Sequence, residues 1–251
     1  MGKIVAVANQ KGGVGKTTTT VNLAACVGSL GKKVLVCDFD PQANATSGLG
    51  LSGRARKSVY DVITGDMDPV GAVLHTKWCD VLPADINLAA AEVELASVEG
   101  REQRLKTVLH ALAPQYDFIF IDCPPSLGVL TLNALVACDT VMVPMQCEYY
   151  ALEGLSQLVN SIRTVKRSLN LQIDIEGIVL TMYDGRTNLT IQVAEEIKRF
   201  FEDKVYKTVA PRNIRLSEAP SHGLPIIEYE RTSKGAEAYQ SIAEEFLRRN
   251  Q

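Results

Sequence analysis

A run of glycines, lysines and threonines at residues 9–18 has the composition of a loop that binds phosphate groups. It reads Asn-Gln-Lys-Gly-Gly-Val-Gly-Lys-Thr-Thr and follows a short β-branched stretch at residues 3–8. Glycines let backbone N–H groups turn toward a phosphate, and the positive end of a helix starting there adds attraction. Lys16 is placed to reach the β- and γ-phosphates, and the Thr17 hydroxyl to bind Mg²⁺. The loop therefore predicts a site for ATP and magnesium.

The loop departs from the usual phosphate-binding pattern GxxxxGK[ST], because Gln10 stands where the first glycine is expected. Lys11 follows, so a second cation lies in the loop. A glycine-rich turn with an incidental lysine is the alternative, and a Gly-Lys-Thr run directly after a strand disfavours it. The residues that we expect to bind the phosphates are Lys11, Gly12, Gly13, Val14, Gly15, Lys16, Thr17 and Thr18.

Acidic residues follow two strongly apolar segments. Asp38 and Asp40 come at the end of the segment at 33–38, and Asp122 follows the segment at 116–121. A buried carboxylate needs a counter-charge, which Mg²⁺ and the lysines would supply. We expect Asp40 to orient the attacking water, so that Lys11, Lys16 and Asp40 form the catalytic set. Thr17, Asp40 and Asp122 are the predicted magnesium residues, with Asp122 acting through a water. For Asp38 two roles stay open: it faces the metal, or its hydrogen bonds only hold the loop in place.

The elements that must position these residues alternate along the whole chain. Strand-like runs are expected at 3–8, 33–38, 116–121, 140–143, 175–181 and 204–209, and helices at 15–30, 85–97, 101–113, 127–137, 153–169, 188–201 and 233–249, with a loop at 212–225. Apolar strands separated by helices predict an α/β fold, a doubly wound, mostly parallel sheet with helices on both faces. Ligands then bind beyond the carboxyl ends of the strands. No linker or repeat interrupts the pattern, so 1–251 is expected to be a single domain.

Composition narrows the class of protein. The chain is 46% hydrophobic with a formal net charge of −3, which excludes a generally basic nucleic-acid coat but not a local basic patch. The sequence shows neither a signal peptide nor a membrane-spanning run, so a cytoplasmic protein is expected. Six cysteines without CxxC spacing and three scattered histidines make a zinc site or a disulfide framework improbable. We expect the cysteines to be reduced and to lie in the core. Cys123 is the one candidate for another role, because it directly follows Asp122.

Five segments together resemble the ParA/Soj family of deviant-Walker chromosome-partitioning ATPases, and the likeness covers nearly the whole chain. They are residues 9–18, 40–50, 122–127, 146–154 and 211–220. One departure is Ala43, where the family more often has glycine. The chain lacks an N-terminal helix-turn-helix extension, so it resembles the short type rather than the type that is also a sequence-specific repressor.

The resemblance implies a P-loop NTPase fold with a deviant Walker A loop and Mg²⁺-dependent ATP hydrolysis. It implies that ATP brings two subunits together as a nucleotide-sandwich homodimer, in which Lys11 reaches the partner's nucleotide and Glu148 contacts the partner subunit. That dimer would bind double-stranded DNA without sequence preference, and a ParB-type centromere-binding protein would stimulate hydrolysis and release. Nucleoid association follows. The adenine is expected at residues that match the family's segments, namely Thr181, Met182, Pro211, Arg212 and Asn213.

The DNA-contacting arginines of the family match Arg186 and Arg215. Residues 198–215 also hold six basic residues against two acidic ones, and this local excess adds Lys198 and Arg199 to the candidates. The alternative for Lys198 and Arg199 is a solvated helix end, where cations favour the helix dipole.

Three other functions remain open at this point. A MinD-like membrane-associated cell-division ATPase needs a C-terminal amphipathic anchor, whereas residues 247–251 are polar. An iron-protein-type ATPase needs thiolates at a dimer axis, for which Cys123 and Cys147 are the candidates. A small-molecule kinase would use the same loop, but no arginine-rich lid segment supports it. The polar C-terminus leads us to expect no membrane partner.

Overall fold

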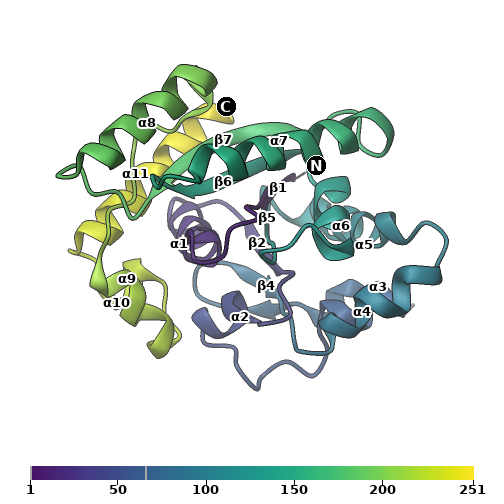
Figure 1. Cartoon of the computed structure of the whole chain (residues 1–251). Helices are drawn as coiled ribbons and strands as arrows, with labels where there is room; N and C mark the ends of the chain where they lie inside the picture. Colours follow the sequence, from purple (N-terminus) through teal and green to yellow (C-terminus); the bar gives the residue numbers. More distant parts are fainter. Residues whose placement is uncertain (1, 66) are drawn as a thin grey trace.

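The computed structural model describes residues 2–65 and 67–251, whose strands form one sheet with helices on both faces (Figure 1). The spatial order in this described part is β3-β4-β2-β5-β1-β6-β7. All neighbours pair in parallel except β3 and β4. The doubly wound, mostly parallel sheet predicted from the sequence is therefore confirmed. The strands are β1 Lys3–Val7, β2 Val34–Asp38, β3 Leu74–His75, β4 Asp80–Leu82, β5 Phe118–Asp122, β6 Thr140–Gln146 and β7 Asp174–Thr181.

Two helical layers cover the sheet. The helices α1 and α11 bury their apolar faces against one side of β1, β2 and β5, and α3 to α8 supply the core on the other side. The α-helices are α1 Lys16–Ser29, α2 Asn44–Gly48, α3 Val59–Thr64, α4 Leu88–Glu94, α5 Arg104–Leu112, α6 Val129–Ala137, α7 Ala151–Ser168, α8 Asn188–Phe201, α9 Ile214–Glu218, α10 Ile226–Tyr229 and α11 Lys234–Arg249. The 3-10 helices are η1 Pro69–Ala72, η2 Leu95–Ser97, η3 Arg101–Gln103, η4 Ala113–Gln115, η5 Glu202–Lys204 and η6 Ala219–His222.

The register of the central strands decides where the site forms. Val7 pairs with Asp122 across β1 and β5, and Asp122 pairs with Asp38 across β5 and β2. Because parallel strands end at the same edge of a sheet, the loop after β1 and the acids at the ends of β2 and β5 come together there. Every residue of β2 and β5 is buried, which explains their apolar sequences without polar alternation.

Some predictions about the elements are wrong. No strand forms over 204–209 in the described chain; η5 leads into it and only an isolated bridge joins Val205 to Ile178. The N–H groups of Tyr206 and Ala210 donate to the carbonyls of Ile178 and Leu180 in β7, but these two bonds are four residues apart, so they form no continuous ladder. Residues 212–225 are not a loop, because the Asn213 side chain accepts the N–H of Arg215 and caps α9. The sequence reading also missed α3, although its capping box, Ser58 with Asp61, is a recognisable signal.

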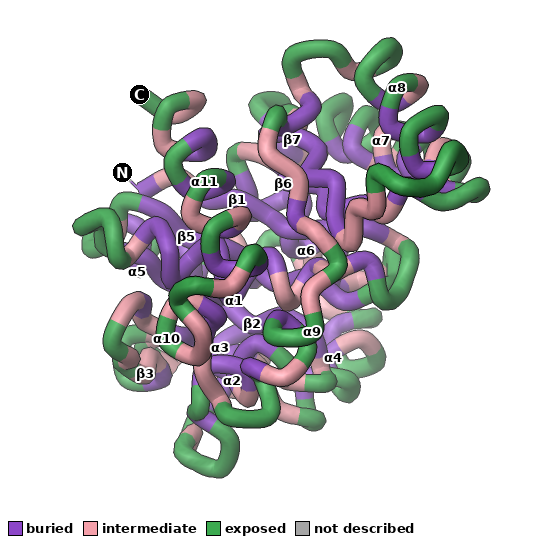
Figure 2. Tube along the Cα trace, turned by 90° about the vertical axis from the view of Figure 1, so that its left-hand side faces the viewer, coloured by how far each residue is buried: buried purple, intermediate pink, exposed green. Residues whose placement is uncertain are grey.

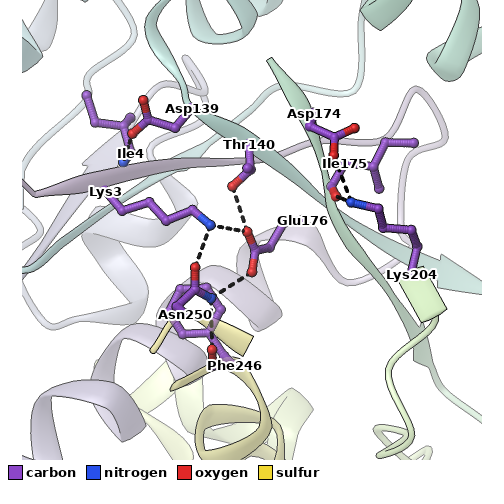
Figure 3. Close-up of polar contacts among 10 residues, drawn as sticks. All are labelled: Lys3, Ile4, Asp139, Thr140, Asp174, Ile175, Glu176, Lys204, Phe246 and Asn250. Atoms are coloured by element: carbon purple, nitrogen blue, oxygen red, sulfur yellow. Dashed lines mark hydrogen bonds and ion pairs between the residues drawn. The ribbon is translucent and has the colours of Figure 1, made fainter. Parts of the chain in front are cut away.

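Helix α11 is fixed to the sheet at both its face and its end. Tyr239, Ile242 and Phe246 are buried in the core. At the end of the helix the Glu176 carboxylate, with a side chain only 4% exposed, accepts hydrogen bonds from Lys3 at 2.6 Å and from Asn250 and Thr140 at 2.8 Å each (Figure 3). The contact joins β1, β6 and β7 to the C-terminal turn. Within residues 2–65 and 67–251, none of the helices has the length and apolar character needed to cross a bilayer.

Replacing Glu176 by alanine is expected to lower the free energy of unfolding by about 2 kcal/mol, because the Lys3 ammonium would lose its buried counter-charge. The cost stays below that of a fully buried pair, since Lys3 is partly exposed. Urea denaturation measures the change. Glu244→Ala is the control, because Glu244 pairs with Arg248 on the exposed side of α11 at 4.0 Å and should matter little. Equal losses in the two variants would contradict this reading.

Candidate nucleotide site

The loop between β1 and α1 is shaped to receive phosphate. Gly13 and Gly15 have φ angles of 72° and 87°, in the left-handed region that other residues enter at a cost. Gly15 is the N-cap of α1, so the helix presents its unpaired N–H groups toward the loop. The Thr181 hydroxyl donates to the Val14 carbonyl at 2.7 Å and holds the loop against the end of β7. The result is a cradle of N–H groups with a fixed backbone.

Lys16, the first residue of α1, brings a buried cation to this cradle. Its side chain donates to the carbonyl oxygen of Lys11 at 3.1 Å, and the residue is 6% exposed. Burial lowers the pKa of Lys16, while the nearby carboxylates of Asp122 and Asp40 raise it. A buried ammonium held by a carbonyl favours a bound anion, and a phosphate oxygen supplies one. The residue therefore fits the phosphate-binding role predicted for it.

Asp122, at the end of β5, lies beside Thr17 of the loop, where it could provide oxygen atoms for a magnesium ion. Its carboxylate accepts the hydroxyls of Thr17 at 2.7 Å and Thr20 at 3.0 Å. Burial and the neighbouring Asp38 carboxylate raise the pKa of Asp122, and these hydroxyls oppose that rise. A hydroxyl and a carboxylate are hard oxygen donors, and Mg²⁺ commonly combines a few such donors with phosphate oxygens and water. The predicted pair Thr17 and Asp122 is thus brought together and fits this cation.

Asp38 and Asp40 differ in what they contact. Asp38 is fully buried and accepts the N–H and the hydroxyl of Thr46, each at 2.7 Å, so it ties α2 to the end of β2. Burial raises the pKa of Asp38, and the hydrogen bonds from Thr46 oppose this rise. Asp40 accepts the N–H of Gln42 at 3.0 Å and lies near Lys16. Among the described residues Asp40 forms no hydrogen bond to Thr17 or Asp122, but its charge raises the pKa of both Asp122 and Lys16, so it lies close to the other two predicted magnesium residues.

Ala43, the position where glycine is more common in the resembled family, is the N-cap of α2 with φ 52°. A side chain in this left-handed conformation costs roughly 1 kcal/mol. The segment that joins Asp40 to α2 therefore ends with a strained residue. The left-handed angle at Ala43 is visible only in the structure, because alanine itself does not favour that conformation.

Lys11 is directed away from the phosphate cradle. Its ammonium forms an ion pair with Glu148 in the loop after β6. Both side chains are about half exposed, at 44% and 50%. The resemblance implies that Lys11 and Glu148 both contact the partner subunit of a dimer. Within one subunit they form an ion pair with each other.

A cavity of about 400 Å³ opens beside the cradle. The predicted adenine residues Met182, Pro211 and Asn213 line it together with Gly15 and Thr18 of the loop. The Asn213 side-chain oxygen is used as the cap of α9, which leaves its NH₂ group as a donor. Thr181, Met182, Pro211, Arg212 and Asn213 are thus brought to one cavity, although they come from two segments far apart in the sequence.

The six basic residues counted along 198–215 do not all lie at one end of the sheet. Lys204 pairs with Asp174 at the amino end of β7 (Figure 3), whereas Arg212 lines the cavity at the carboxyl end. The eight residues of that strand separate them by about 23 Å. Lys198 and Arg199 lie in the last turn of α8, while Arg186 precedes its first turn. The local excess counted along 198–215 is therefore divided between two ends of the sheet.

Arg186 and Arg215 lie on segments that meet. Tyr183 bridges to Pro211 just after β7, and its N–H donates to the carbonyl of Ala210. Arg186 is paired with Asp184 at 2.7 Å, and Arg215 with Glu218 at 2.8 Å. Both guanidinium groups are solvent-accessible and have an acidic neighbour that a phosphate would have to replace.

Three site residues were missed by the sequence reading. Thr20 holds the second oxygen of Asp122, and its spacing of three residues from Thr17 on one helix is a signal that was available. Asn9 donates to the carbonyl of Pro144 at 2.9 Å and accepts the Lys11 N–H. Gln146 donates to the Gly13 carbonyl at 3.4 Å. The last two contacts cross from β1 to β6, so no local pattern predicts them.

Comparisons with known proteins place this fold and loop in a family. The family model of an AAA domain matches residues 2–175, which contain the loop and the three acids. The chain is 59% identical to the sporulation initiation inhibitor protein Soj of Bacillus subtilis (strain 168) over 98% of each chain. It is 48% identical to the chromosome-partitioning ATPase Soj of Treponema pallidum (strain Nichols), over 100% of this chain and 99% of that one.

Among solved structures, a cobyrinic acid a,c-diamide synthase from Mycobacterium smegmatis with a bound ATP analogue and magnesium superposes with a TM-score of 0.88. It is 39% identical, and the match covers 99% of this chain and 95% of that one. A related protein of this fold therefore binds nucleotide and magnesium. The higher identity to the partitioning proteins, over nearly complete chains, is the stronger guide to the family.

Proposed function

This chain belongs to the Soj/ParA family of chromosome-partitioning ATPases, and from that premise we propose that ATP converts it into a DNA-binding dimer. The observation that carries the proposal is the meeting of Lys16, Thr17 and Asp122 at one edge of the sheet. In this proposal the loop residues Lys11 to Thr18 bind ATP, and Mg²⁺ neutralises phosphate charge. Hydrolysis then returns the protein to a form without DNA affinity.

Each residue has a separate task in hydrolysis. The N–H groups of the loop and the Lys16 ammonium hold the phosphates and stabilise the charge that develops on them. Thr17 and Asp122 hold Mg²⁺, Asp122 through a water. Asp40 orients the attacking water, and the fixed backbone contact to Gln42 supports its position. Asp38 accepts two hydrogen bonds from Thr46 on one oxygen and the N–H of Asp40 on the other, so its task in this proposal is to place α2 and the Asp40 loop.

Dimer formation would use the exposed pair Lys11 and Glu148. In the proposed dimer the Lys11 ammonium leaves Glu148 and turns to the partner's nucleotide. Because both partners are anionic, the ammonium keeps a negatively charged partner in either state. The adjacent aromatic residues Tyr149 and Tyr150 are 77% and 68% exposed, which suits an interface that forms only with nucleotide.

DNA binding would rest first on Arg186 and Arg215, since they lie on adjoining segments near the nucleotide cavity. Lys198 and Arg199 are the second candidates, at the far end of α8. A dimer doubles either set and overcomes the net charge of −3 per chain. If about six phosphates are neutralised, log affinity should fall with log salt at a slope near −5. A ParB-type protein is the proposed activator of hydrolysis, and association with the nucleoid follows.

Arg215→Glu is expected to lose DNA binding while still dimerising with ATP, because two reversed charges per dimer would face the phosphates. Fluorescence anisotropy with a labelled duplex, at two salt concentrations, measures the affinity. Arg248→Glu is the matched control, since Arg248 also pairs with a glutamate on its own helix and is exposed. If Arg215→Glu bound DNA with wild-type affinity, the DNA-binding surface would have to lie elsewhere. If the affinity did not depend on salt, contacts to DNA phosphates would not account for the binding.

The alternatives are less well supported. A MinD-like membrane anchor would require a free amphipathic C-terminal helix, but the apolar face of α11 is buried and Asn250 is bound to Glu176. Flotation with liposomes in the presence of ATP tests this reading. An iron-protein function would require accessible thiolates, whereas Cys123 and Cys147 are buried and burial raises the pKa of each thiol. Turnover without an acceptor substrate would count against a small-molecule kinase.

A further inference from the structure

Two segments on the nucleotide side of the fold meet at a pair of glycines. Gly50 follows α2 and Gly223 follows η6, and their φ angles are 73° and 65°. A β-carbon on Gly223 would lie 2.6 Å from Cα of Gly50, and one on Gly50 would lie 2.8 Å from the carbonyl oxygen of Gly223. Both distances are far below van der Waals contact. The two backbones therefore touch directly, with no space for a side chain.

Each glycine ends a segment that begins at the nucleotide site. Segment 40–50 starts at Asp40 and runs through α2. Segment 213–223 starts at Asn213 in the adenine cavity, carries Arg215 in the first turn of α9, and continues through η6. The glycine contact is thus the point where a candidate catalytic loop meets the element that holds a candidate DNA-binding arginine.

Internal hydrogen bonds make each segment rigid. In the first, the Ser47 hydroxyl donates to the carbonyl of Ala43 at 2.7 Å, and the Gly50 N–H donates to Ser47 at 3.0 Å. In the second, Asn213 caps α9 and the Gly223 N–H donates to the carbonyl of Pro220 at 3.0 Å. Each segment can therefore shift as a unit.

Space beside the contact permits such a shift. A pocket of about 440 Å³ separates the rest of the two segments, and α1 forms its third wall. Figure 2 shows α1, α2, α9 and α10 gathered in the lower part of the molecule. The residues that line the pocket are Thr17, Thr18, Val21, Asn22, Asn44, Ser47, Gly48, Ala219, Pro220, Ser221 and Leu224.

We propose that the Gly50–Gly223 contact couples the nucleotide state sensed at Asp40 to the DNA affinity set by Arg215. The proposal rests on the DNA binding proposed above and assigns both glycines as positioning residues. Because backbones in contact cannot pass through one another, a displacement of segment 40–50 displaces segment 213–223. Thermodynamic linkage requires the reverse effect, so DNA binding must also alter segment 40–50.

Alanine substitutions test the contact, and the chain provides a matched control. Gly53 has φ 70°, close to the angles of Gly50 and Gly223, but a β-carbon there would meet nothing within 4 Å. Gly53→Ala therefore introduces the same backbone strain without the steric contact. We expect Gly50→Ala and Gly223→Ala to form the ATP dimer normally and to bind DNA about tenfold more weakly, a usual size for coupling. Gly53→Ala should bind DNA within about twofold of the wild type.

The possible outcomes distinguish failure of this coupling from failure of the proposed DNA binding on which it rests. Wild-type protein that binds no DNA with ATP would overturn both. Wild-type protein that binds DNA, together with dimeric Gly50→Ala and Gly223→Ala variants that bind it equally well, would overturn the coupling alone. Hydrogen exchange on the wild-type ATP dimer gives a test that needs no variant. Adding duplex DNA should change amide protection at 44–50 as well as at 214–223, and unchanged exchange at 44–50 would overturn the proposal.

Discussion

Lys16→Ala is expected to reduce ATP affinity by at least about a hundredfold, since charge-assisted hydrogen bonds to phosphate are among the strongest that proteins make. The ammonium is buried at the start of α1, and its protein partner is only a carbonyl. No other buried cation among the described residues of the loop can take its place, because Lys11 is directed to Glu148. Fluorescent-nucleotide titration measures the affinity.

The control for this variant is Lys11→Ala in the same loop. It should bind ATP with nearly normal affinity but fail to dimerise, because Lys11 is half exposed and paired outside the cradle. The two lysines thus have separable phenotypes. Normal ATP affinity in Lys16→Ala would refute the phosphate-loop assignment, and a hundredfold loss in Lys11→Ala would show that the tasks are not divided as proposed.

Asp40→Ala is expected to bind ATP and to lose turnover by roughly 10²–10⁴-fold, the range that a positioned general base contributes. Since hydrolysis ends the dimeric state in the proposed cycle, this variant should also remain dimeric with ATP. Phosphate release under single-turnover conditions measures the chemical step, and sizing measures the trapped dimer.

Asp40→Asn distinguishes chemistry from loop geometry. Asparagine keeps an oxygen that can accept the Gln42 N–H but removes the negative charge. Both substitutions should therefore lose turnover. Asp40→Asn with wild-type turnover would mean that Asp40 shapes the loop and that another group orients the water.

The central part of the site was predictable because two local patterns and one rule of topology define it. Apolar runs that end in Asp38 and Asp122 predict parallel strands, and such strands place their final residues at one edge with the loop after β1. Asp38 illustrates the limit of that reasoning. The pattern placed its carboxylate at the edge, but only the structure shows that one carboxylate oxygen accepts two hydrogen bonds from Thr46 and the other accepts the N–H of Asp40.

Contacts between distant segments could not be predicted from the residues alone. The Lys11–Glu148 pair spans 137 positions, and which of several exposed acids meets Lys11 depends on how β6 and the loop after it are placed. The cavity beside the loop likewise joins the end of β7 to residues 211–213. Its residues were named by resemblance to a family as the place for adenine, and no spacing along the chain indicates that they meet.

The basic residues show why counting charges along the chain misleads. Residues 198–215 contain an excess of four positive charges in sequence. The backbone turns through η5 within this stretch, so Lys204 lies at the start of β7 and Arg212 near its end. Only the positions of the side chains, and not their number, define a surface.

The central claim is that ATP, and not ADP, makes the protein a DNA-binding dimer. Size-exclusion chromatography with light scattering, in ATP or ADP and with or without a DNA duplex, tests it most directly, with Asp40→Ala used to prevent hydrolysis. We expect a 27.3 kDa monomer with ADP, a mass twice as large with ATP, and elution with DNA only in the ATP sample. A monomer in ATP, or equal DNA binding in ADP, would contradict it.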